Sequence, residues 1–120
     1  MAGRILLVED SVMISSAFRM LLEAKGYGVD VAATAAEAVT IDVTEPHDLM
    51  LLDLTLPDAD GLSVIEGLAV RAVRPKSIVA MTGHADQATR TRCIAAGCDD
   101  VLIKPVPVRK LLSLVAFRMP

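Results

Sequence analysis

Five short apolar runs alternate with five helix-like segments along the chain, and this alternation restricts the fold more than any other feature. The apolar runs, which are predicted as β-strands, are residues 4–8, 27–32, 48–52, 77–82 and 100–103. The helix-like segments are residues 12–25, 34–45, 62–73, 86–96 and 107–118. Strands that alternate with helices are typical of a parallel sheet covered by helices on both faces. Because such crossovers are right-handed, we predict a doubly wound α/β sheet.

Helix start and stop signals support these boundaries. Thr34 and Glu37 form a capping box at the start of the second helix. Gly26 and Gly97 stand where the first and fourth helices should end. The run 48–52 is almost continuously apolar, as expected of a central strand buried on both faces. No linker or repeat interrupts the 120 residues, so we predict one domain over residues 1–120.

The bulk composition excludes several classes of protein. Hydrophobic residues make up 53% of the chain and aromatic residues only 2%, which indicates an aliphatic core. The net charge of −3 argues against direct binding to nucleic acid. No apolar run approaches the roughly 20 residues of a membrane span. Cys93 and Cys98 have neither redox nor zinc-site spacing and are expected to be reduced, as in a cytoplasmic protein.

Polar side chains follow four of the predicted strands. Glu9 and Asp10 come after the first strand, Asp53 after the third, Thr82 closes the fourth, and Lys104 follows the fifth. Because the carboxyl ends of parallel strands share one edge of the sheet, we expect these groups to converge on one pocket.

The predicted pocket has the chemistry of phosphoryl transfer. Three neighbouring carboxylates repel one another and favour a bound cation. An all-oxygen site suits a hard divalent ion, and Mg²⁺ fits best because it needs few protein ligands. A carboxylate such as Asp53 can act as a nucleophile and form an aspartyl-phosphate. Lys104 and Thr82 offer a positive charge and a hydroxyl to the phosphoryl oxygens.

Four segments of the chain resemble a known family. They are ILLVED at the first strand, LMLLDLTLPDADGL around Asp53, IVAMTGH around Thr82 and GCDDVLIKP before the last helix. Together they resemble the receiver domain of two-component response regulators, in its single-domain, CheY-like form. The resemblance covers essentially the whole chain. It implies a flavodoxin-like fold with five parallel strands in the order 2-1-3-4-5 and five helices.

The resemblance also implies a role for each pocket residue. Asp53 becomes the phosphoacceptor, Thr82 the switch hydroxyl and Lys104 the lysine that contacts the phosphoryl group. The Lys104–Pro105 peptide bond is expected to be cis. The implied Mg²⁺ ligands are Glu9, Asp10, Asp53 and the backbone carbonyl of Thr55.

A receiver domain of this kind has two sorts of partner. The phosphoryl donor is expected to be a histidine kinase or a histidine phosphotransfer protein. A downstream protein is expected to bind the face formed by the fourth helix, the fifth strand and the fifth helix. Phe117 points away from the buried face of the last helix and is a candidate contact there. We expect a monomer or weak dimer that catalyses only its own phosphorylation and dephosphorylation, and not a turnover enzyme.

Val101 departs from the family pattern. Receiver domains usually carry Tyr or Phe three residues before the lysine, and the ring turns inward on activation. A valine has no ring and is stiff at χ1. We therefore expect activation to change residues 83–90 more than the fifth strand.

Three other functions are compatible with the predicted topology. A small-molecule phosphatase with an aspartyl nucleophile typically has a second Asp two residues later, where this chain has Thr55. A flavin or nucleotide carrier needs a glycine- or hydroxyl-rich phosphate loop after the first strand, where this chain has acids. A scaffold without phosphorylation chemistry has no need for Asp53, Thr82 and Lys104 together.

Overall fold

A five-stranded parallel sheet forms the centre of the protein, which a computed structural model describes for residues 3–72 and 74–119. The strands are β1 (Arg4–Val8), β2 (Gly28–Ala32), β3 (Leu49–Asp53), β4 (Ser77–Thr82) and β5 (Asp100–Ile103). The helices are α1 (Val12–Ala24), α2 (Ala35–Thr44), α3 (Ser63–Val70), α4 (Gln87–Ala96) and α5 (Val108–Arg118). The strand order β2-β1-β3-β4-β5 confirms the flavodoxin-like prediction.

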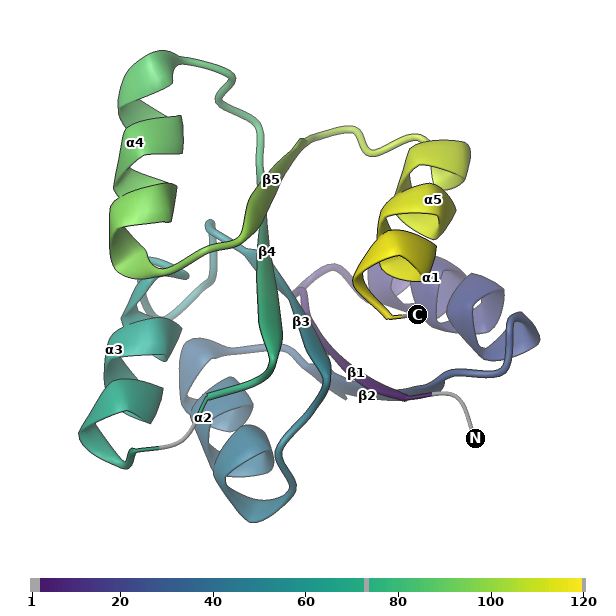
Figure 1. Ribbon diagram of the computed structural model, residues 1–120, viewed down its shortest axis with the longest axis horizontal. Helices are drawn as coiled ribbons and strands as arrows, with labels where there is room; N and C mark the ends of the chain where they lie inside the picture. Colours follow the sequence, from purple (N-terminus) through teal and green to yellow (C-terminus); the bar gives the residue numbers. More distant parts are fainter. Residues whose placement is uncertain (1–2, 73, 120) are drawn as a thin grey trace.

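Helices cover both faces of the sheet, with α1 and α5 on one face and α2, α3 and α4 on the other (Figure 1). Alternate residues of each strand point to opposite faces, so the sheet divides the apolar interior into two cores. In β3, Met50 and Leu52 pack with α2 and α3, whereas Leu49 and Leu51 pack with α1 and α5. Every residue of β3 is buried, as predicted for a central strand.

The predicted caps at Thr34, Gly26 and Gly97 are confirmed, and Asp86 is a further N-cap, at the start of α4. The Thr34 hydroxyl accepts a hydrogen bond from the Glu37 N–H, and the Asp86 carboxylate accepts one from Thr89. Gly26 and Gly97 lie at φ 94° and 111°, backbone conformations that glycine adopts without strain. No helix within the described ranges has both the length and the apolar character needed to cross a bilayer.

Three predicted boundaries differ from the structure. The third helix was expected to reach about residue 73 but ends at Val70, whose side chain is 88% exposed and gains nothing from a further turn. Residue 73 itself lies outside the described residues. Strand β3 is shifted by one residue relative to the predicted run 48–52 and includes Asp53. Pro107 precedes α5 as its N-cap and is not part of its first turn.

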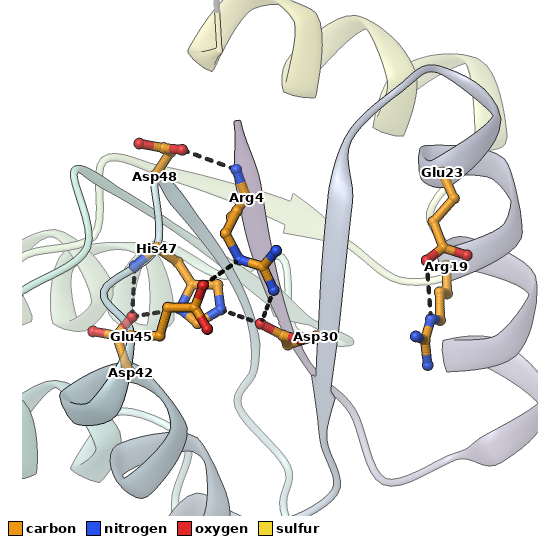
Figure 2. A network of polar contacts seen from close by, with 8 residues as sticks. All are labelled: Arg4, Arg19, Glu23, Asp30, Asp42, Glu45, His47 and Asp48. Carbon is orange, nitrogen blue, oxygen red and sulfur yellow. Dashed lines mark hydrogen bonds and ion pairs between the residues drawn. The ribbon is translucent and has the colours of Figure 1, made fainter. Parts of the chain in front are cut away.

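A buried histidine just before β3 joins the middle of β2 to helix α2, a feature that the sequence did not indicate (Figure 2). The side chain of His47 is fully buried, and its two ring nitrogens lie 2.9 Å from Asp42 Oδ1 and 2.8 Å from Asp30 Oδ2. Both carboxylates can accept a hydrogen bond only if both ring nitrogens carry protons. Burial opposes the charge, but the hydrogen bonds to Asp42 and Asp30 outweigh it, and the pKa of His47 is raised.

Arg4 extends this network across β1. Its Nη2 lies 2.6 Å from Asp30 Oδ2, and its Nε lies 3.2 Å from Glu45 at the end of α2. Its backbone N–H donates to Asp48, whose other oxygen lies 3.3 Å from the exposed Lys76. The edge strand β2 is therefore held to its neighbours by charged groups as well as by the sheet.

We predict that protonated His47 makes folding stability depend on pH. The folded protein holds this proton more tightly than the unfolded chain does. The contribution of protonated His47 to the free energy of unfolding is therefore complete below the ordinary pKa of 6.5. It is lost as pH rises through the raised folded value, by up to about 1.4 kcal/mol per pH unit. Urea unfolding between pH 6 and 9 measures this slope.

His47→Gln should flatten the slope, because glutamine has no titrating proton. His84→Gln is the matched control, since His84 is the other histidine of the chain and lies exposed. Equal pH slopes in His47→Gln and the wild type would contradict the assignment.

Candidate phosphorylation site

Asp53 lies at the carboxyl end of β3 with its side chain almost fully buried. Its two oxygens have different partners. Oδ1 accepts a hydrogen bond of 2.9 Å from the Thr55 N–H, and Oδ2 accepts one of 2.8 Å from Lys104 Nζ. Lys104 directly follows β5, so this ion pair spans the sheet from β3 to β5 across β4. The predicted convergence of Asp53 and Lys104 is confirmed.

Glu9 and Asp10 complete an acidic cluster beside Asp53. Each of the three residues offers a carboxylate oxygen within 4.8 Å of the others. Asp10 is exposed, whereas Glu9 is buried. Neither side-chain oxygen of Glu9 has a hydrogen-bond donor among the described residues, and its nearest cation is Lys104 Nζ at 3.7 Å.

Burial raises the pKa of Glu9 to about 7, and the neighbouring Asp53 carboxylate acts in the same direction. Burial would also raise the pKa of Asp53, but its contacts with Glu9, Lys104 and Thr55 outweigh burial and lower it. A proton at this cluster therefore resides on Glu9, and Asp53 stays ionised. Two buried, unpartnered oxygens beside an ionised carboxylate fit a bound divalent cation, which would replace that proton.

Thr82 and Thr55 occupy the rim of the same site. Thr82 is the last residue of β4 and is buried. Its Oγ1 accepts a hydrogen bond of 3.1 Å from the His84 N–H, and its backbone carbonyl accepts one from the backbone N–H of Lys104. Thr55 is exposed and lies two residues beyond Asp53. The metal-ligand role of its carbonyl stays a prediction. The Lys104–Pro105 peptide bond is cis, as expected.

Gly61 lies against the site and was not among the site residues that the sequence predicted. A Cβ at this position would collide with the backbone of Asp53 and Leu54. The Gly61 N–H also donates a hydrogen bond of 2.9 Å to the Leu54 carbonyl. Only glycine allows the loop to return this closely to the end of β3. The Asp-Gly pair at 60–61 signalled a turn, but not which backbone it would touch.

Comparisons with known proteins agree with this arrangement. The sequence model of the response regulator receiver domain matches residues 5–116. The transcriptional regulatory protein ResD of Bacillus subtilis is 33% identical over 112 residues, which are 93% of this chain and 46% of ResD. The alginate biosynthesis transcriptional regulatory protein AlgB of Pseudomonas syringae pv. tomato is 40% identical over 103 residues, 86% of this chain and 23% of AlgB.

A solved structure shows the same fold. The response regulator receiver domain protein (CheY-like) from Methanospirillum hungatei JF-1 superposes with a TM-score of 0.88 at 31% identity, and the match covers 98% of this chain and 94% of that one. The chain belongs to the response regulator receiver domain family of two-component systems, whose members act in phosphorylation-dependent signalling. It spans less than half the length of the two curated relatives.

We predict that Lys104→Met destabilises the protein. The substitution removes the cation beside two buried carboxylates, and breaking such a pair is costly. Because Lys104 is 30% exposed, the expected loss is moderate. We expect the free energy of unfolding to fall by about 1–3 kcal/mol.

Urea denaturation measures the loss, with Lys110→Met as the control, since Lys110 is exposed and pairs with no acid in the described ranges. Added Mg²⁺ should restore part of the stability of Lys104→Met, because a bound cation replaces the missing charge. Equal losses in both variants would show that the ion pair does not stabilise the site.

Proposed function

We propose that this chain is a phosphorylation-dependent switch in which Asp53 takes a phosphoryl group from a partner's phosphohistidine. The observation that carries the proposal is the environment of Asp53. Lys104 Nζ and the Thr55 N–H each donate a hydrogen bond to this carboxylate, which lies beside two Glu9 oxygens that have no donor in the described part of the chain. Membership of the receiver family supports the same conclusion.

The transfer uses groups that are already in place. A carboxylate oxygen of Asp53 attacks phosphorus, the P–N bond to the donor imidazole breaks, and its electron pair leaves with the imidazole. Lys104 Nζ, now 2.8 Å from Asp53 Oδ2, offers its charge to a phosphoryl oxygen, and the Thr82 hydroxyl offers a hydrogen bond to another. Glu9, Asp10, Asp53 and the Thr55 carbonyl would hold Mg²⁺, which neutralises charge on the transferred group.

Apolar groups next to the site support a protein as the phosphodonor. Val12 and Met13 at the start of α1 are 75% and 83% exposed. Met13 also lines a cavity of about 450 Å³ whose other lining residues include Glu9, Lys104 and Phe18. An exposed apolar patch beside a reactive group is typical of a docking surface. A histidine kinase or a histidine phosphotransfer protein is the donor that fits the proposed chemistry.

The output surface is proposed to be the face formed by α4, β5 and α5. Phe117 is 75% exposed, as its position on α5 predicted, and Ile94 on α4 is 52% exposed. The curated relatives are transcriptional regulatory proteins, but the net charge of −3 argues against direct DNA binding by these residues. We propose that the signal passes by protein contact in the cytoplasm. The only catalysis we propose is self-phosphorylation and autodephosphorylation.

Acetyl phosphate with Mg²⁺ is expected to add one phosphoryl group to the wild-type chain. The addition should be absent from Asp53→Ala, because the nucleophile is missing. Intact-mass spectrometry reads both results. No adduct on the wild type, or an equal adduct on Asp53→Ala, would refute the proposed function.

The valine at position 101 leads to a second prediction, about which segments change when the protein is phosphorylated. It is buried in the core with the α3 and α4 residues and has no ring that could relocate. Hydrogen exchange with and without beryllofluoride, a phosphoryl mimic, should therefore change more at residues 83–90 than at 100–103. Equal or larger changes in β5 would show that the strand relays the signal despite Val101.

A further inference from the structure

Helix α4 is held only lightly to the rest of the domain. Cys93 is its one buried side chain within the described part of the chain, whereas α3 buries Val64, Ile65 and Leu68. Most other α4 side chains are exposed. Because burial supplies most of the stability of a docked helix, α4 can shift at a low cost in free energy. A single polar contact therefore makes up a larger share of the free energy that holds α4 than it would for α3.

One ion pair joins the middle of α4 to the loop that follows the phosphoacceptor. Arg92 Nη2 lies 3.0 Å from Asp60 Oδ2, 32 residues away in the sequence. The other oxygen of Asp60 accepts a hydrogen bond of 2.9 Å from the Leu62 N–H. The Leu62 N–H therefore orients the Asp60 carboxylate independently of Arg92. This orientation lowers the side-chain entropy that is lost when the ion pair forms.

The same loop leads directly back to the site. Asp60 forms an antiparallel bridge with Thr55, whose N–H donates to Asp53. Between the loop and α4 lies a polar cavity of about 430 Å³, with Thr55 and Thr82 on one side and Arg92 on the other. A series of contacts thus links the phosphoacceptor to α4 without passing through β5. It runs from Asp53 through Thr55 and Asp60 to Arg92.

We propose that the Arg92–Asp60 ion pair holds α4 against the phosphoacceptor loop in the unphosphorylated protein and thereby restrains activation. This inference rests on the proposed function and adds the regulation of the same site. The Thr55 N–H donates to Asp53, and Thr55 and Thr82 both line the cavity beside α4, so a phosphoryl group on Asp53 is expected to adjoin this cavity. If phosphorylation breaks this contact, the free energy that the pair contributes to the unphosphorylated protein opposes phosphoryl binding, because coupling between sites is reciprocal.

Arg92→Gln tests the contact, and Arg90→Gln is its matched control. Arg90 lies on the same helix, is exposed, and makes no ion pair with residues in the described ranges. In ligand-free protein, α4 amides should exchange about two- to fivefold faster in Arg92→Gln than in Arg90→Gln, the range expected of an exposed ion pair. Asp60→Asn keeps an oxygen for the Leu62 N–H and should match Arg92→Gln. The double variant should show no further increase.

Affinity for beryllofluoride in the presence of Mg²⁺ gives the second readout. It should rise about two- to fivefold in Arg92→Gln and stay at the wild-type value in Arg90→Gln. Wild-type exchange and affinity in Arg92→Gln would overturn the inference and leave the proposed function standing. A wild-type protein that does not bind beryllofluoride would overturn the proposed function, while the ligand-free exchange rates would still show whether the pair holds α4.

Discussion

The ion pair between Lys104 and Asp53 is the contact on which the arrangement of the site depends. Three carboxylates gather at the end of the central strands, and two of them are buried. Lys104 is the group from β5 that offsets this charge. The compensation is incomplete, because the Glu9 oxygens find no donor in the described part of the chain. A site that is short of positive charge suits a bound cation, and that cation would then offset the negative charge of a phosphoryl group.

At the opposite end of the sheet, clustered carboxylates are neutralised in a different way. There, Asp30 and Asp42 face a buried histidine, and Arg4 adds a second cation (Figure 2). Positive groups lie within hydrogen-bonding distance of both acids, so this cluster joins strands and a helix. The two ends of one sheet thus carry charged clusters of different use. The cluster around His47 holds the edge strand in place, and the acidic cluster around Asp53 is suited to binding a cation.

The helices differ in how firmly they pack on the sheet, and this difference underlies the signal route that we propose. Helix α3 is anchored by three buried apolar side chains, whereas α4 has one and relies in addition on Arg92. Val101 fills its place in the core without a ring that could move. A lightly packed helix tied by Arg92 to the loop after Asp53 is the route that we propose for the signal, and it does not need the usual aromatic residue.

The sequence by itself determined the five strands and helices, the parallel sheet and the meeting of Asp53 with Lys104. Periodicity and capping are local properties, and the shared edge of a parallel sheet follows from topology alone. The end of α3, the close approach of Gly61 to Asp53, the buried His47 and the Arg92–Asp60 pair were decided only by the tertiary structure. His47 contacts Asp30 across 17 residues of sequence and Arg92 contacts Asp60 across 32, whereas Gly61 meets Asp53 through the path of one loop. No local pattern encodes such a distance, because it is set by how the helices pack on the sheet.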